Sequence, residues 1–422
     1  MWALIDCNSF FCSVEKVFHP GLNGKPVCVL SSNDGNIVAL TPEAKALGLH
    51  RGDPVFKVKS ILEANKVNIF SSNLMLYAAM SRRILSILRK EIMQVENYSI
   101  EESFCNLHGY EKMGPLDSFM RNIVEKIRLY TDIPVSVGIA PSKTLAKMGS
   151  KYAKQYAGYR SVCLIDTEEK RRKALELFDL ADVWGIGPRT FDKLCDYGIR
   201  TPLELADKSE TWVKQRFSLP MVRTWHELNG RPCIDTTETN QKQSICTSRS
   251  FGQMITELDD LKASVANFAA SCANKLRGQH SVAKAVTVFV MSNRFREDME
   301  QYYNSATYLI EVPTADTIEI TEAAMQVTET LYKKGIWYKK SGVVLSEIAS
   351  DKHQVGHLFD TIQNRPERRK LMDAIDTINQ RYGVHTVQLA VAGSETEEWK
   401  SKSEQRSPNY LTDLDDILTI QI

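Results

Sequence analysis

The sequence predicts an α+β (α/β) protein that is built from several domains. Its 422 residues exceed the length of one typical domain, and its hydrophobic and charged contents of 43% and 25% are ordinary for a globular chain. Strand-like and helix-like segments are mixed up to about residue 165, and short helices joined by glycines follow at 183–207. After a polar stretch at 229–244, the predicted order is strand, helix, strand, strand, helix, strand.

The elements before residue 165 are predicted from apolar periodicity and turn residues. An apolar segment at 2–11 predicts the first strand, and VCVL and NIVAL predict two more around a turn at Asn33-Asp34-Gly35. A short helix is expected from Pro42 to about Gly48, and a longer one over 74–92. Two strand-like arms flank the acid pair at 101–102. A helix near 116–130, a strand at 133–140 and a lysine-rich helix follow.

The elements after residue 165 differ in composition and in length from those before it. Residues 183–207 predict two compact helix–turn–helix units, and the stretch at 229–244 predicts a linker because it is polar and lacks periodicity. Beyond it we expect strands at 245–251, 283–291, 306–312 and 338–348, with helices at 258–276 and 318–334. This split βαβ order predicts a small ferredoxin-like domain. From about residue 350 the chain turns polar and predicts a tail that is at best partly ordered.

Composition excludes several classes of protein. The net charge of +1 indicates no global attraction to a polyanion, so basic patches must be local. No run approaches the roughly 18 apolar residues of a membrane span. The N-terminus has no basic region and carries Asp6 early, which is untypical of a signal peptide. The nine scattered cysteines, without a CxxC pair, favour reduced thiols and a cytoplasmic location.

Three carboxylates lie in apolar, strand-like surroundings. Asp6 follows Leu4 and Ile5, while Glu101 and Glu102 are adjacent at the turn of a hairpin-like unit. Burying these charges is costly unless a partner compensates them, and a pair of Mg²⁺ ions would do so. The residues alone also permit a simpler interpretation, in which the glutamates lie in water at a hairpin tip and Asp6 is a turn residue.

Four lysines recur on one face of the predicted helix after residue 141. Lys143, Lys147, Lys151 and Lys154 are separated by four, four and three residues. Their mutual repulsion would be relieved by a triphosphate or a DNA backbone along that face. A solvated basic stripe is the alternative.

Glycines and aromatic residues provide two further signals. Gly185 and Gly187 in WGIGPRT are typical of a helix–hairpin–helix turn, whose backbone N–H groups can bind a phosphate, although an ordinary helical hairpin fits as well. Phe10 and Phe11 follow Asp6 closely. Such pairs usually belong to the core, but one of them would lie near the sugar of a nucleotide if Asp6 held a metal.

Together these motifs resemble those of the Y-family translesion DNA polymerases, and within them the UmuC-type catalytic subunits of bacterial DNA polymerase V. DCNSFF at 6–11 resembles the first acidic motif of the family, YSIEESF at 98–104 the second, and VSVGIAPSKTLAKMGSKYAK the lysine-bearing third. DVWGIG resembles the thumb hairpin and CTSRSFG the entry to the last domain. The resemblance covers nearly the whole chain.

The resemblance implies a right-hand polymerase. It places a palm at 1–165 with small fingers inserted at about 12–73, a helix–hairpin–helix thumb at 166–232 and a linker at 233–243. A ferredoxin-like little finger is expected at 244–349 and a partner-binding tail at 350–422. The implied activity is error-prone, template-directed DNA synthesis past damaged bases, as in SOS mutagenesis and DNA repair. Because the fingers have only about 60 residues, we expect weak discrimination between nucleotides.

The resemblance also assigns roles to individual residues. Asp6, Glu101 and Glu102 are the implied catalytic and metal-binding acids, with the backbone carbonyl of Cys7, for two Mg²⁺ ions or for Mn²⁺ as a substitute. The residues implied to bind the incoming nucleotide are Phe10, Phe11, Lys45 and Lys154, with Phe11 as the steric gate. The implied DNA contacts are Gly185, Gly187, Arg189, Lys143, Lys147 and Arg249.

The sequence departs from the family pattern in two places. The second motif of the family reads Ser-Ile-Asp-Glu, and this chain has Glu101 where the aspartate stands. The extra methylene extends the side chain by about 1.5 Å, and Mg²⁺ tolerates such displacement poorly. Pro42 stands where many relatives carry a polar or aromatic residue. A catalytically impaired DNA-binding scaffold of the same fold is therefore an alternative, and a nucleotidyl cyclase is a weaker one.

The implied partners are primer-template DNA, a dNTP, a UmuD′-like dimer, RecA and a sliding clamp. A clamp-binding peptide is expected at Gln354, Leu358 and Phe359, although Gln354 lies one residue earlier than in the usual pattern. Apolar residues in the last segment, 410–422, are candidates for binding the accessory dimer.

Overall fold

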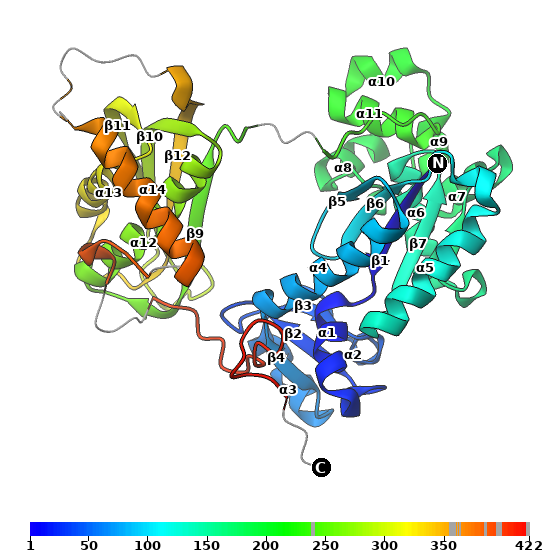
Figure 1. Cartoon of the computed structure of the whole chain (residues 1–422), viewed down its shortest axis with the longest axis horizontal. Coiled ribbons are helices and arrows are strands. Elements are labelled where there is room, and N and C mark those ends of the chain that lie inside the picture. Colours follow the sequence, from blue (N-terminus) through cyan, green and yellow to red (C-terminus); the bar gives the residue numbers. More distant parts are fainter. Residues whose placement is uncertain are drawn as a thin grey trace. The chain divides into compact units, whose positions relative to one another are not determined.

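The computed structural model describes residues 1–237, 241–353, 360, 362, 364–383, 386–393 and 399–418. The chain forms two compact units (Figure 1). The first comprises Met1–Thr239 together with Glu404–Ile422, and the second comprises Asn240–Ser403. The segment expected to form one tail at 350–422 is therefore divided between the two units.

A five-stranded sheet with the order β5-β6-β1-β7-β8 is the centre of the first unit. Strand β1 is antiparallel to both β6 and β7, whereas β7 and β8 are parallel. The strands are β1 (Trp2–Cys7), β5 (Val95–Asn97), β6 (Glu102–Asn106), β7 (Val135–Ala140) and β8 (Val162–Leu164). The helices around them are α1 (Phe10–Phe18), α4 (Leu74–Glu91), α5 (Leu116–Thr131) and α6 (Lys143–Gln155).

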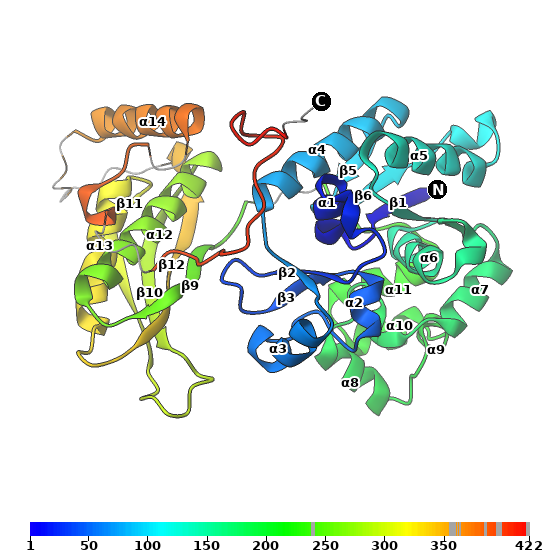
Figure 2. The same cartoon turned by 90° about the horizontal axis from the view of Figure 1, so that it is seen from below.

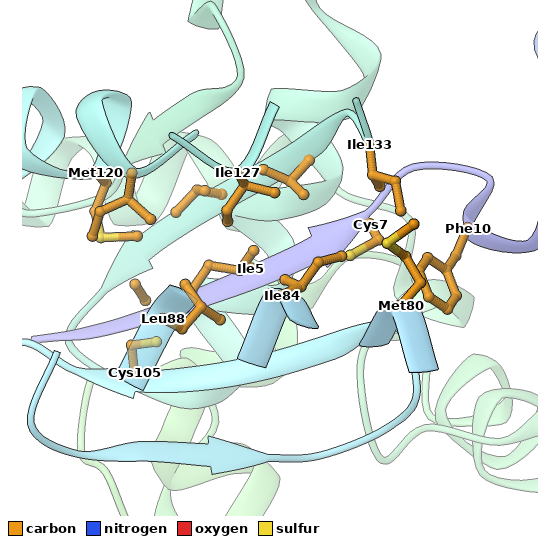
Figure 3. Packing of buried hydrophobic residues seen from close by; sticks show 14 of the residues in the cluster. Ile5, Cys7, Phe10, Met80, Ile84, Leu88, Cys105, Met120, Ile127 and Ile133 are labelled. Carbon is orange, nitrogen blue, oxygen red and sulfur yellow. The ribbon is translucent and has the colours of Figure 1, made fainter. Parts of the chain in front are cut away.

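Side chains of β1 alternate between two hydrophobic cores, as a strand buried on both faces requires. Ile5 and Cys7 pack toward α4 and α5, together with Ile84 and Ile127 (Figure 3). Leu4 belongs to the other core, which α6 and the thumb helices share. Because alternate residues share a face, Asp6 lies on the same face of the sheet as Leu4.

The fingers contain a three-stranded sheet with the order β3-β2-β4 and its own small core. Its elements are β2 (Val27–Leu30), β3 (Ile37–Leu40), α2 (Pro42–Ala46), α3 (Val55–Ala64) and β4 (Asn68–Ser71). The thumb is helical and shares a core with the α6 face of the palm. Its helices are α7 (Glu168–Leu177), α8 (Pro188–Asp196), α9 (Pro202–Ala206), α10 (Glu210–Arg216) and α11 (Leu219–Leu228).

The second unit is a four-stranded antiparallel sheet, β11-β10-β12-β9, packed against two helices that contact each other. Its elements are β9 (Ile245–Ile255), α12 (Leu258–Gly278), β10 (Ser281–Ser292), β11 (Tyr303–Thr314), α13 (Thr317–Leu331), β12 (Tyr338–Ser350) and α14 (Arg365–Tyr382). This arrangement confirms the expected split βαβ order. Helix α14 was not predicted, and it is tied to this unit by ion pairs of Arg368 with Asp316 and of Asp376 with Arg277.

Two observations bear on the exclusions drawn from composition. No helix among the described residues combines the length and the apolarity needed to cross a bilayer. All nine cysteines lie in the described part of the chain and all are free thiols.

Candidate active site

Strand pairing brings the three predicted acids together. In the register of β1 and β6, Asp6 lies directly opposite Glu102. Glu101 immediately precedes β6, and its carbonyl oxygen accepts a hydrogen bond from the Cys7 N–H at 3.0 Å. Since Leu4 and Phe104 are also paired and both belong to the α6-side core, Asp6 and Glu102 face α6 as well.

Two glycines allow α6 to lie very close to this sheet. A Cβ atom at Gly138 on β7 would come within 2.0 Å of the Ala146 carbonyl oxygen, and one at Gly149 within 3.0 Å of the Gly138 Cα. The close approach brings lysines of α6 to the acids. Lys147 Nζ lies 2.7 Å from Glu102 Oε1, and Lys154 Nζ lies 3.1 Å from Asp6 Oδ2.

Burial and mutual repulsion both disfavour the charged forms of Asp6 and Glu101. Burial raises the pKa of Asp6 above its ordinary value, and the repulsion from Glu102 adds to this, although Lys154 opposes both. Burial likewise raises the pKa of Glu101, Asp6 raises it further, and Arg51 lowers it. A bound cation would therefore relieve an unfavourable charge cluster.

The donor atoms at the site suit a hard divalent cation. The carboxylates offer only oxygen, the ligand type that Mg²⁺ prefers. The Cys7 thiol is buried in the core and its pKa is raised, so only the backbone of Cys7 is left to reach the site. Within the described residues, however, no group of three or more Asp, Glu, His or Cys side chains is already arranged around a common point. The lysines hold Asp6 and Glu102 instead.

The predicted lysine stripe is not a free basic surface. Lys147, Lys151 and Lys154 are paired with Glu102, Asp182 and Asp6. Lys143 is only 2% exposed, forms an ion pair with Glu96 and donates to Thr236 Oγ1. The assignment of Lys143 to DNA is therefore wrong for this structure, because its ammonium group is enclosed. Lys147 is directed at the acids rather than along an open DNA-facing stripe.

The two phenylalanines after Asp6 have different environments. Phe10 is 1% exposed and packs in the core beside Cys7 and Met80 (Figure 3). Its assignment to the nucleotide is therefore corrected to a core role. Phe11 is only partly buried, and its ring stacks on Tyr77 with the centroids 4.5 Å apart. Of the pair, Phe11 is thus the residue with an accessible ring.

The fingers carry two exposed basic residues, one of which acts electrostatically on Glu101. Lys45 is exposed on α2, whose first turn is capped by the side chain of buried Thr41. Arg51 is exposed in the loop that follows, and its charge acts on Glu101. Sequence reasoning missed Arg51, and only its position near Lys45 could have suggested it. It also missed Ser9, whose positive φ of 46° turns the chain from β1 into α1.

In the turn of the thumb hairpin, one position requires a glycine. Gly185 has a φ of +93°, and a Cβ there would meet Thr224 Oγ1 at 2.5 Å. Gly187 is the N-cap of α8 with ordinary backbone angles and open space around it, and Arg189 is exposed in the first turn. Between these glycines and the acids, Trp184 Nε1 donates to the Tyr98 hydroxyl at 3.0 Å.

The remaining predicted residues are not part of this cluster. Arg249 is exposed on β9 in the second unit. The predicted clamp-binding residues Gln354, Leu358 and Phe359 lie outside the described residues.

Comparison with known proteins identifies related families over most of the chain. Residues 5–151 match the impB/mucB/samB family, and residues 242–358 match the C-terminal domain of that family. Residues 369–420 match a domain of unknown function (DUF4113).

Curated relatives match along the full length. Protein UmuC of Salmonella typhimurium is 38% identical over 423 residues, which cover 100% of both chains. Protein ImpB of Salmonella typhimurium is 39% identical over 420 residues, covering 99% of each chain. DNA polymerase IV 1 of Halalkalibacterium halodurans is 31% identical over 232 residues, covering 54% of each.

Solved structures share the fold. The Y-family DNA polymerase chimera Dbh-Dpo4(243-245)-Dbh aligns with a TM-score of 0.64 at 21% identity, covering 83% of this chain and 99% of its own. An insertion ternary complex of Dbh DNA polymerase aligns with a TM-score of 0.52 over the same shares.

Proposed function

Because this chain belongs to the impB/mucB/samB family and has the fold of Y-family DNA polymerases, we propose that it extends primers past damaged template bases by two-metal nucleotidyl transfer. The observation that carries this proposal is the pairing of Asp6 with Glu102 beneath two lysines of α6. In this proposal the acids bind the metal ions and the lysines bind phosphate.

The acids and the lysines would separate when substrate binds. Asp6, Glu101, Glu102 and the backbone carbonyl of Cys7 would hold two Mg²⁺ ions. Such ions would supply activation of the primer 3′-hydroxyl and stabilisation of the leaving pyrophosphate. Lys154 is 37% exposed, so it would exchange Asp6 for phosphate oxygens of the incoming dNTP. Lys45 and Arg51 would bind the same triphosphate from the fingers.

The other residues would select and position the substrates. Phe11, with its accessible ring, is the candidate steric gate against a ribose 2′-hydroxyl. Gly185, Gly187 and Arg189 of the thumb would contact the DNA backbone, as would Arg249 of the second unit. Such contacts add salt-sensitive affinity without choice of sequence. The small fingers would check the nascent base pair weakly, which agrees with error-prone synthesis past lesions.

Primer extension by the purified full-length chain tests this proposal. We expect extension on undamaged and abasic templates with Mg²⁺ or Mn²⁺, and a loss of at least about a hundredfold in Asp6→Asn and Glu102→Gln. Glu63→Gln, at an exposed position of α3, is the matched control and should retain full activity. Absence of extension with either ion, with the partner proteins present, would contradict the proposal.

The alternative is a DNA-binding scaffold whose chemistry is impaired by Glu101. The Glu101→Asp variant distinguishes the two, since it restores the shorter carboxylate of the family pattern. A large gain in extension would locate a defect at this carboxylate. Tight primer-template binding without extension in either form would favour the scaffold.

We also propose a UmuD′-like dimer and RecA as partners, on the basis of the full-length similarity to UmuC. Exposed apolar side chains near the C-terminus support a protein contact there, namely Leu411, Leu414, Ile417 and Leu418. Pull-down of the accessory dimer by the wild-type chain, but not by Leu414→Asp, would test this contact. A sliding clamp remains a further proposed partner.

A further inference from the structure

The segment 404–410, here called the C-terminal strap, is built into the first unit although it follows the second unit in the chain. It extends the finger sheet at the edge of β4. The Ser71 N–H donates to the Gln405 carbonyl at 2.9 Å, the Gln405 N–H donates to Ser71 Oγ at 2.9 Å, and Arg406 forms a parallel bridge with Ser71. Figure 1 shows this segment, in red, beside β4.

Side chains of the first unit fix the strap from Ser407 to Tyr410. Asn73 is fully buried, and its amide donates to the carbonyl oxygens of Ser407 at 2.8 Å and Pro408 at 3.2 Å. The same side chain caps α4 by accepting a bond from the Leu76 N–H. Tyr410 stacks on Phe18 of α1 with the ring centroids 4.7 Å apart. Figure 2 shows the strap at the start of α4.

A chain of buried contacts leads from the strap to Phe11. Ser407 Oγ donates to Glu15 Oε1 at 3.0 Å, and the Tyr77 hydroxyl donates to the same oxygen at 2.6 Å. Tyr77 is fully buried, and its ring forms the surface on which the Phe11 ring stacks. The strap is therefore linked, through Glu15, to the ring that supports the candidate steric gate.

Glu15 makes this chain sensitive to the loss of Ser407. The side chain is fully buried on α1, and among the described residues its Oε2 atom has no hydrogen-bond partner. Its two donors, Tyr77 and Ser407, share the other oxygen. If Ser407 is removed, the carboxylate keeps only the tyrosine donor, and an under-satisfied buried acid is free to change its rotamer and that of Tyr77.

We propose that the strap is an integral part of the polymerase core and that Ser407 is a positioning residue for sugar selection. Through Glu15 and Tyr77 it holds Phe11 in the orientation that excludes a ribose 2′-hydroxyl. This inference rests on the proposed role of Phe11 as the gate. It assigns to the C-terminus an intramolecular function that is separate from partner binding.

The preference for dNTP over rNTP in primer extension measures this effect, as the ratio of the two kcat/KM values. Ser407→Ala is expected to lower the ratio about fivefold, the change that one net hydrogen bond gives. Ser407→Thr keeps the donor and should retain most of the preference. Ser60→Ala, at an exposed position of α3, is the matched control. Phe11→Ala gives the largest decrease in the ratio, because it removes the proposed gate itself.

A purely structural role for Ser407 would lower both kcat/KM values equally and leave their ratio unchanged. That result, with a reduced ratio in Phe11→Ala, would overturn the inference while leaving the gate in place. An unchanged ratio in Phe11→Ala would instead refute the gate, and this inference with it.

Hydrogen exchange of the full-length protein tests the strap without relying on activity. The Ser71 and Gln405 amides should be protected in the wild type, and the double variant Ser407→Arg, Tyr410→Ala should lose this protection while the β1 amides keep theirs. Rapid exchange at both amides in the wild type would overturn the docking of the strap, whether or not the protein extends primers.

Discussion

Asp6 and Glu102 are direct neighbours across β1 and β6, and each carboxylate has its own lysine from one helix, α6. Lys147 and Lys154 are seven residues apart, so about two helical turns separate them on the same face. The arrangement stabilises two partly buried acids in the absence of a bound cation. Any cation that binds these acids, or phosphate that binds these lysines, would have to compete with the two ion pairs.

If Mg²⁺ binds as proposed, adding it should stabilise the folded protein, because Asp6, Glu101 and Glu102 lie close together only in the folded state. At about ten times the dissociation constant, the gain is about 1.4 kcal/mol, or roughly 3–5 °C in Tm. Thermal melts with and without MgCl₂ measure it. The double variant Asp6→Asn, Glu101→Gln should show no shift, and an equal shift in both proteins would place the bound ions elsewhere.

The stability of the metal-free protein should depend on pH in a defined direction. Burial raises the pKa values of Asp6 and Glu101 in the folded state, from ordinary values of 3.8 and 4.5. The folded protein therefore binds these protons more tightly than the unfolded chain. The two groups therefore stabilise the fold fully at pH values below 3.8 and 4.5. This stabilisation is lost as the pH rises through their raised pKa values in the folded state. Melts over this range should show a smaller loss in the double variant, and an unchanged slope would contradict the assignment.

Replacing each of the two adjacent phenylalanines by alanine should affect a different property: sugar selection for Phe11 and stability for Phe10. Phe11→Ala should raise ribonucleotide incorporation at least about tenfold at nearly unchanged stability, because the ring is only partly buried. Phe10→Ala removes a ring from the core and should lower the free energy of unfolding by about 3–5 kcal/mol. Denaturant melts and rNTP kinetics separate the two effects. Unaltered sugar selection in Phe11→Ala would show that another residue guards that position.

Lys154→Ala should raise the KM for dNTP about tenfold, since a charge-assisted contact to phosphate is lost. Its affinity for primer-template DNA should change less. Lys151→Ala is the matched control on the same face of α6, because Lys151 is paired with Asp182 rather than with a site acid. Steady-state kinetics and DNA titrations give both quantities. A greater loss of DNA affinity than of dNTP affinity would assign Lys154 to the DNA.

Much of this fold follows from local patterns in the sequence. Apolar residues on both sides of Asp6 predict a strand, and the segments that flank 101–102 predict two more. That the first strand pairs with the one after 101 is seen in the structure. The periodicity of α6 predicts which lysines share a face. It does not predict the residue with which each lysine forms an ion pair. Lys143 and Lys154 belong to one regular series, yet the first meets buried Glu96 and the second meets Asp6. Such partners depend on tertiary contacts between segments far apart in the chain.

The C-terminal segment illustrates the same limit. Its polar composition up to residue 409 predicts poor order, because that stretch has few apolar residues for a core of its own. The strap is held instead by backbone hydrogen bonds to Ser71 and by the buried amide of Asn73, more than 330 residues away. No local pattern in the strap or around Ser71 and Asn73 predicts that these two segments pair. Only Tyr410, an aromatic residue in a polar stretch, could have suggested a docking point.

Gly138 is expected to be indispensable for bringing α6 to the acids. Its Cβ position lies 2.0 Å from the Ala146 carbonyl and 2.2 Å from the Ser150 nitrogen, both backbone atoms that cannot rotate away. Gly138→Ala must therefore push α6 from the sheet, at a cost of at least about 1–3 kcal/mol in the free energy of unfolding. Because Lys147 and Lys154 move with the helix, the KM for dNTP should rise as well.

Gly158→Ala is the matched control, since a Cβ there meets nothing within 4 Å. Its free energy of unfolding should stay within about 0.5 kcal/mol of the wild type. Denaturant melts and dNTP titrations of both variants test the expectation. If Gly138→Ala were as stable and as active as Gly158→Ala, the close contact between α6 and β7 would not be what positions the lysines at Asp6 and Glu102.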